Sequence, residues 1–150
     1  MAPRVGFTVC GLGHALPNRR IDNQTLARNL DTSHAWIVGR TGIHARRVAD
    51  ADETTTALAV RAAVEVLGAA GLSPSALDLV VVATSTPDSS CPATASRVAA
   101  ELGTRGGGFD VNAACCGFVY ALHTAVALLA DTIGTVLVIG ADRYSTLADP

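Results

Sequence analysis

Four cysteines are the strongest candidates for nucleophilic chemistry in this sequence, and two of them, Cys115 and Cys116, are adjacent. They lie between a β-rich run at residues 109–112 and a long apolar segment of helical character that extends to residue 130. At such a strand-to-helix turn, unpaired backbone amides and the positive end of the helix dipole stabilise a thiolate over a thiol. Adjacent helical residues point about 100° apart, so only one of the two thiols can face a given pocket. A buried, inert cysteine is the ordinary alternative.

The residues that are absent also narrow the chemistry. All eleven basic residues are arginines, and none is a lysine. A Walker-type phosphate loop, a Schiff base and the attachment of pyridoxal phosphate each need a lysine, so these three classes are excluded. Among Cys10, Cys91, Cys115 and Cys116, no two show the C-x-x-C spacing of zinc or thioredoxin-like sites. We therefore expect neither a metal site nor a cofactor.

Length and composition predict one globular unit with a substantial core. The chain has 150 residues, of which 49% are hydrophobic and 16% charged. Its net charge of −2 gives no global reason to bind nucleic acid or an anionic membrane. No apolar stretch reaches the ~18 residues that a membrane span needs, and no secretory signal is evident. We therefore expect a cytoplasmic protein.

Hydrophobic periodicity predicts strands that alternate with helices. The run 79–83 is short, continuously apolar and β-branched, which is typical of a strand covered on both faces. Apolar positions recur at helical spacing over residues 55–70. Further predicted elements are strands at 5–11, 109–112 and 136–139 and helices at 24–30, 34–40, 92–102 and 116–130. The alternation predicts an α/β layered domain with a mostly parallel sheet.

Capping residues give the expected boundaries of the helices. Asn23 is expected to cap the helix that follows it, and residues 31–33 supply a cap for the next one. Pro92 suits the first turn of a helix, and Gly103 is expected to end that helix. The glycines at 106–108 precede a strand rather than a helix, so they indicate a flexible loop and not a phosphate cradle.

The helix predicted at 116–130 is apolar around its whole circumference, unlike the amphipathic one at 55–70. A helix of this kind is buried on all sides, so it needs sheets above and below it. The strands predicted here supply about one sheet. We infer that these 150 residues are one half of a larger layered fold or one partner in a tight assembly; an Ala-rich helix that tolerates exposure is the alternative.

The cysteine turn, Ala114-Cys115-Cys116-Gly117-Phe118, resembles the nucleophile motif of the β-ketoacyl-acyl-carrier-protein synthase III family, which belongs to the thiolase-like condensing enzymes. Similar stretches occur in family order along nearly the whole chain. They are Asp31-Thr32-Ser33 with Trp36-Ile37, Arg40-Thr41-Gly42-Ile43, Glu53-Thr54, residues 82–88, residues 109–111 and residues 139–142. The resemblance implies a thiolase-like layered fold, of which residues 1–150 form the N-terminal half with a buried central helix.

The resemblance also implies a reaction. Cys115 would take an acyl group from an acyl-CoA primer, and the resulting thioester would condense with malonyl-acyl carrier protein after decarboxylation. In the family, a catalytic His and a catalytic Asn from the second half of a longer chain complete the site. Neither of these two catalytic residues is present among residues 1–150. We therefore expect these residues alone to accept an acyl group slowly at best and not to condense. The main alternative is a relative that transfers the acyl group to an alcohol or amine, and a non-catalytic dimerisation subunit is the least favoured alternative.

Coenzyme A binding is assigned by the resemblance to Thr32, Trp36 and Arg40. A Trp face can stack on adenine and an Arg fork can bind phosphate, although a half-buried Trp and a solvated Arg are the plainer interpretation. In several relatives, a Phe closes the acyl pocket of the neighbouring subunit in a homodimer, and Cys91 stands at that position. A smaller side chain predicts a deeper pocket, which accepts primers longer or more branched than acetyl. His34 replaces an acidic residue of the family pattern.

Overall fold

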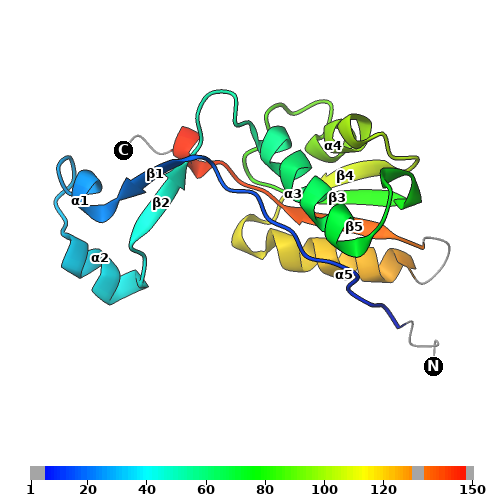
Figure 1. The fold of residues 1–150 in the computed structure, drawn as a ribbon, viewed down its shortest axis with the longest axis horizontal. Helices are drawn as coiled ribbons and strands as arrows, with labels where there is room; N and C mark the ends of the chain where they lie inside the picture. Colours follow the sequence, from blue (N-terminus) through cyan, green and yellow to red (C-terminus); the bar gives the residue numbers. More distant parts are fainter. Residues whose placement is uncertain (1–5, 130–133, 148–150) are drawn as a thin grey trace. The chain divides into compact units, whose positions relative to one another are not determined.

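The computed structural model describes residues 6–129 and 134–147, which form two compact units. Unit 1 combines residues up to Ala15 with Thr55–Asp142, and unit 2 combines Leu16–Thr54 with the residues from Arg143 onward (Figure 1). Unit 1 contains the parallel sheet and the cysteine turn, and unit 2 contains the residues expected to bind coenzyme A. No helix among the described residues is long and apolar enough to cross a membrane.

A three-stranded parallel sheet forms the centre of unit 1. Its strands are β3 (Leu79–Ala83), β4 (Gly107–Val111) and β5 (Val136–Gly140), in the spatial order β4-β3-β5. Because β3 is the middle strand, its valines at 80, 81 and 82 are fully buried. This confirms the prediction of a strand covered on both faces and of a parallel sheet. Burial of each such valine contributes about 1.5–3 kcal/mol to stability.

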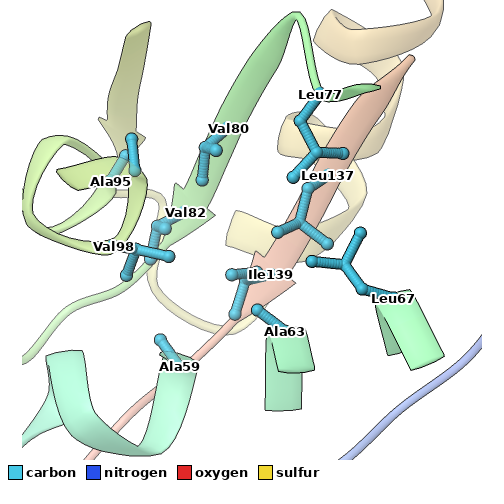
Figure 2. Packing of buried hydrophobic residues seen from close by; sticks show 11 residues of the cluster. Ala59, Ala63, Leu67, Leu77, Val80, Val82, Ala95, Val98, Leu137 and Ile139 are labelled. Atoms are coloured by element: carbon cyan, nitrogen blue, oxygen red, sulfur yellow. The ribbon is translucent and has the colours of Figure 1, made fainter. Parts of the chain in front are cut away.

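Helices cover both faces of this sheet (Figure 1). One face packs against α3 (Thr55–Ala70) and α4 (Thr94–Leu102), and the other packs against α5 (Gly117–Leu129). Figure 2 shows the first of the two cores, in which small alanine side chains of α3 and α4 let these helices pack closely on the strands. Its main members are Ala59, Ala63, Leu67, Val80, Val82, Ala95, Val98, Leu137 and Ile139. The alternating residues Val81 and Ala83 face the other core with Ala121.

Unit 2 is built on an antiparallel strand pair, β1 (Arg19–Asp22) and β2 (Ala45–Val48). Two helices, α1 (Asn23–Leu26) and α2 (His34–Thr41), connect these strands in the chain. Ser33 caps α2 as predicted, since its hydroxyl accepts a hydrogen bond from the backbone nitrogen of Trp36 at 3.1 Å.

The predicted cap of α1 was wrong by one residue, and the helix is shorter than expected. Asp22 is the cap, because its carboxylate accepts the backbone N–H of Thr25 at 2.8 Å. This hydrogen bond is the main reason why the pKa of Asp22 is lowered. Asn23 is instead fully buried, where its amide donates to the carbonyl of Ile43 at 2.7 Å and accepts from Arg46 at 2.9 Å. Tertiary contacts, rather than capping preference, decided between two equally suitable residues.

Three further expectations need correction. Residues 6–15 form no strand, because no strand of the described chain pairs with them. Instead, Gly11 and Gly13 lie against α3, where a Cβ on Gly13 would come within 2.7 Å of the carbonyl oxygen of Ala62. Helix α4 begins at Thr94 rather than at Pro92. The glycines at 106–108 are not a flexible loop, since β4 begins at Gly107 and the first and third of them are tightly packed.

Two aspartates hold the N-termini of the helices on the core. Asp88 accepts the backbone N–H groups of Thr55 and Thr56 at the start of α3, at 2.9 and 2.8 Å. Asp110 of β4 similarly accepts those of Thr94 and Ala95 at the start of α4, at 2.7 and 2.8 Å. Each carboxylate therefore satisfies two otherwise unpaired amides and complements the helix dipole.

The substitution Asp110→Ala is expected to destabilise unit 1 by about 2 kcal/mol, because it leaves two amides at the start of α4 without their acceptor. Urea unfolding of the purified protein measures this loss. The control is Glu101→Ala, which removes an exposed carboxylate from the same helix. Equal stability of the two variants would contradict the capping role of Asp110.

Candidate active site

The turn that carries the paired cysteines follows β4 directly. A single 3₁₀ turn, Ala114–Cys116, joins the strand to α5. Ala114 has φ +45°, a left-handed conformation that costs a non-glycine residue roughly 1 kcal/mol or more. Both thiols are exposed. Gly117 is buried at the start of α5, where a Cβ would make an ordinary contact of 3.4 Å with the Cβ of Ala83. The predicted strand-to-helix turn is therefore confirmed, although its thiols lie just before α5.

Polar residues from three strands meet beside this turn. Neighbouring parallel strands bring their carboxyl ends to one edge of the sheet, which is where α/β proteins place their sites. Asp142, after β5, accepts the backbone N–H of Ser85, after β3, at 2.8 Å. The Ser85 hydroxyl lies 3.3 Å from the side-chain oxygen of Asn112. That oxygen in turn lies 3.5 Å from the backbone nitrogen of Ala114. Hydrogen bonds thus connect all three strand ends to the strained residue before Cys115.

The stretches that contain Asp142 and Ser85 are similar to the family pattern, and Asn112 ends the strand predicted at 109–112, but none of the three residues was given a role from the sequence. The available signal was the position of each residue at the carboxyl end of a predicted parallel strand or within three residues of it. The missing information was the strand order, because β3 lies between β4 and β5 rather than at one edge of the sheet.

The face of α5 that points away from the sheet is exposed in this chain. Gly117, Ala121 and Ala125 are buried, whereas Phe118, Val119 and Tyr120 are 49%, 68% and 58% exposed. The expected burial on every side is therefore not met by the described residues themselves. The exposed face begins at the residue after Gly117, so it adjoins the cysteine turn.

The residues expected to bind coenzyme A lie on and before α2 in unit 2. Trp36 is 58% exposed, and the guanidinium carbon of Arg40 lies 5.6 Å from the centre of its ring, which is a cation–π contact. One turn of helix separates the two residues, which explains why they meet. The Thr32 hydroxyl is buried and has no hydrogen-bond partner among the described residues, so it does not point to solvent as the other two side chains do.

Cys91 is exposed and lies in the loop between β3 and α4. The loop is held by Arg97 of α4, whose guanidinium donates to the hydroxyl of Ser89 at 2.9 Å. Unit 1 therefore brings Cys115 together with Ser85 and Asn112, and it carries Cys91 on a separate loop. Among the described residues, no group of three or more histidine, cysteine or acidic side chains is arranged to hold a metal ion.

Comparisons with known proteins agree with this architecture. A family model described as 3-oxoacyl-[acyl-carrier-protein (ACP)] synthase III matches residues 109–150, which include the cysteine turn. Beta-ketoacyl-[acyl-carrier-protein] synthase III 2 of Streptomyces coelicolor is 50% identical over 98% of this chain and 44% of its own length. The corresponding synthase III of Paramagnetospirillum magneticum is 49% identical over 94% of this chain and 44% of its own.

Solved structures show the same likeness. The 3-oxoacyl-[acyl-carrier-protein] synthase III from Aquifex aeolicus superposes with a TM-score of 0.91 at 43% identity, over 96% of this chain and 47% of that chain. The priming β-ketosynthase from the R1128 polyketide biosynthetic pathway gives a TM-score of 0.90 at 38% identity, over 94% of this chain and 43% of that chain. The fold is therefore thiolase-like. The chain is similar to β-ketoacyl-acyl-carrier-protein synthase III along nearly its whole length, and it spans less than half the length of the relatives it matches.

Proposed function

We propose that this chain supplies the nucleophile of a condensing enzyme that initiates fatty acid or polyketide biosynthesis, with Cys115 as the acyl acceptor. The observation that carries the proposal is the exposed Cys115 thiol at a strained turn, at the carboxyl edge of a parallel sheet. The matches to synthase III relatives support it, because one of them covers 98% of this chain.

The proposed reaction has two steps. The Cys115 thiolate attacks the carbonyl carbon of an acyl-CoA thioester, and the thiolate of coenzyme A leaves. The malonyl thioester of an acyl carrier protein then loses its carboxylate as carbon dioxide, and the resulting carbanion attacks the acyl-enzyme. The sulfur of Cys115 leaves as the thiolate, so the enzyme is regenerated. An apolar surrounding favours the loss of a charged carboxylate as neutral carbon dioxide, and the exposed apolar face of α5 adjoins the turn.

The catalytic residues of the complete enzyme are proposed to come partly from this chain and partly from a second half, which corresponds to the part of the relatives that this chain does not cover. We propose that these residues form the first half of the complete layered fold, and that the second half covers the exposed face of α5. By the family resemblance, the second half also supplies the His and Asn that stabilise the enolate. Formation of an enolate needs hydrogen-bond donors placed around the oxygen on which negative charge develops.

A test of this division supplies the purified chain with acetyl-CoA and malonyl-acyl carrier protein. Acyl transfer to Cys115 without ketoacyl product is expected. Ketoacyl product formed by these residues alone would contradict the assignment of the condensation step to residues outside them.

Coenzyme A is proposed to bind at α2. The Trp36 ring offers an exposed face for adenine, and the Arg40 guanidinium stacked beside it offers donors for phosphate. Because Thr32 buries its hydroxyl, its contribution would come through the backbone before α2 rather than through that oxygen.

Primer selection is proposed to depend on Cys91 across a homodimer interface. In the complete protein, Cys91→Phe is expected to shrink the acyl pocket and to lower kcat/KM for branched or longer primers by about tenfold relative to acetyl-CoA. The control is Ser90→Phe, which adds the same ring to the adjacent exposed position. Measured primer preferences that are equal in the wild type and in Cys91→Phe would contradict the role of Cys91.

A further inference from the structure

Ala114 is the strained residue of the cysteine turn, and it lies immediately before Cys115. Its φ of +45° is a left-handed conformation, which residues other than glycine keep only when their surroundings hold them in it. The direction in which the chain leaves Ala114 sets the position of Cys115, so the contacts that hold this conformation also place the thiol. Among the described residues, Asn112 is the one whose side chain forms a hydrogen bond with the backbone of this turn.

The contact between Asn112 and Ala114 is a local one. The side-chain oxygen of Asn112 lies 3.5 Å from the backbone nitrogen of Ala114, two residues further along the chain. Asn and Asp side chains commonly accept the amide two residues on, and the contact then shapes a turn. Because the backbone N–H is a donor, the oxygen of the Asn112 amide must face it rather than the nitrogen. A distance of 3.5 Å is long for such a bond, so the Asn112 side chain needs a second contact to stay in place.

Ser85 supplies this second contact from the neighbouring strand end. Its hydroxyl lies 3.3 Å from the side-chain oxygen of Asn112, and since an amide oxygen only accepts, the hydroxyl donates. Ser85 follows β3 and Asn112 follows β4, which are paired through their backbones. The backbone nitrogen of Thr84 extends this pairing, because it donates to the carbonyl of Val111 at 3.1 Å. The oxygen of Asn112 is therefore held between a donor of its own turn and a donor from the end of β3.

Asp142, after β5, holds the segment that carries Ser85. One oxygen of its carboxylate accepts the backbone N–H of Ser85 at 2.8 Å. The same oxygen accepts the hydroxyls of Thr84 and Thr86 at 3.4 and 3.2 Å, and both threonines are buried. Hydrogen bonds to a charged acceptor are roughly twice as strong as those between neutral groups. The carboxylate of Asp142 thus fixes three consecutive residues beside the cysteine turn.

We propose that Asn112 and Ser85 are positioning residues for the Cys115 thiol, and that Asp142 holds Ser85 in place. They act through the backbone of Ala114 rather than by contact with the reacting atoms. The inference rests on the proposed function, which makes Cys115 the acyl acceptor. Attack on a thioester needs the sulfur about 3 Å from the carbonyl carbon, and a displacement of about 1 Å can lower the rate of such a step about a hundredfold.

The first test introduces Asn112→Ala and Ser85→Ala separately into the complete protein and measures the rate at which iodoacetamide alkylates Cys115. We expect each substitution to lower this rate about fivefold, because the turn relaxes and the sulfur moves away from the unpaired amides at the start of α5. Ser85→Thr keeps the hydroxyl at an exposed position, so it is expected to keep the wild-type rate. Urea unfolding verifies that each variant remains folded. Rescue by threonine separates positioning by the hydroxyl from a general effect on the fold.

The matched control is Ser75→Ala, which removes an exposed hydroxyl from the segment before β3 instead of after it. Ser75 also contacts one polar side chain, since its hydroxyl lies 2.8 Å from that of Ser73. We expect alkylation of Cys115 to be unchanged in this control. The proposal is overturned if either Asn112→Ala or Ser85→Ala stays within about twofold of the wild type. It is also overturned if Ser85→Thr is as slow as Ser85→Ala, or if Ser75→Ala slows alkylation equally.

The second test measures acyl transfer from acetyl-CoA and separates this proposal from the proposed function. In Asn112→Ala, we expect the rate of Cys115 acylation at saturating acetyl-CoA to fall about tenfold. The acetyl-CoA concentration that gives half of this rate is expected to stay within about twofold, because Asn112 is not among the residues proposed to bind coenzyme A. A full limiting rate with a raised half-saturating concentration would overturn the positioning role. If the wild type is alkylated as expected but never acylated, the proposed function fails and the positioning of the thiol stands.

Discussion

Substitution of Cys115 by alanine in the complete protein is expected to lower the rate of condensation by at least about a thousandfold, because no acyl-enzyme can form without the sulfur. Cys116 follows in the same 3₁₀ turn, and its thiol is also exposed. Successive residues of a helical turn point in different directions, so both sulfurs cannot occupy the same position relative to a bound thioester.

The matched control is Cys116→Ala, for which we expect condensation to remain within about threefold of the wild type. Steady-state formation of ketoacyl product measures both variants, and urea unfolding verifies that each remains folded. If Cys116→Ala loses the activity and Cys115→Ala retains it, the nucleophile has been assigned to the wrong sulfur.

Substitution of Gly106 by alanine is expected to destabilise unit 1 by about 3 kcal/mol. A Cβ at this position would overlap the carbonyl group of Asp78, and backbone atoms cannot move aside as a flexible side chain can. Asp78 precedes the central strand β3, so relief of the overlap would displace the pairing of β3 with β4. We also expect slower alkylation of Cys115, because β4 leads directly into the cysteine turn.

The neighbouring glycine provides the control for this prediction. A Cβ on Gly107 meets no atom within 4 Å, so Gly107→Ala is expected to change the free energy of unfolding by no more than about 0.5 kcal/mol. Urea unfolding compares the two variants with the wild type. Equal stability of the two would show that the backbone approach at Gly106 is not a constraint on the fold.

Elements with a strong local pattern were predicted from the sequence with the correct type and bounds. A continuous run of β-branched residues predicts a strand buried on both faces, and apolar residues at helical spacing predict a helix buried on one face. The structure contains β3 and α3 over the residues predicted in this way. Gly103 likewise ends α4 in the left-handed conformation that only glycine adopts freely. In these segments, local preference and tertiary packing favour the same structure.

Features that depend on distant residues were predicted poorly. A strand needs a partner, and residues 6–11 have the composition of a strand but no partner among the described residues. Asp22 and Asn23 are equally good caps, and only the contacts of Asn23 with Ile43 and Arg46 decide between them. The close approach of Gly106 to Asp78 depends on the pairing of β3 with β4, which composition does not reveal.

The candidate site shows the same division. The strand-to-helix turn with its paired cysteines follows from the local sequence, so it was predicted correctly. The hydrogen bonds from Asp142 through Ser85 and Asn112 to Ala114 depend on the order of three strands, and that order is set by the packing of whole elements. The roles of Cys115, Trp36, Arg40 and Cys91 stay predictions until they are measured.

The most direct measurement is to locate the acyl group after the protein is incubated with an acyl-CoA, by mass spectrometry of its peptides. Cys115 and Cys116 fall in one peptide, so fragmentation between them must assign the added mass. We expect the acyl group to lie on Cys115, and we expect prior treatment of a second sample with iodoacetamide to block its attachment. An acyl group found on Cys116, or on neither sulfur, would contradict it.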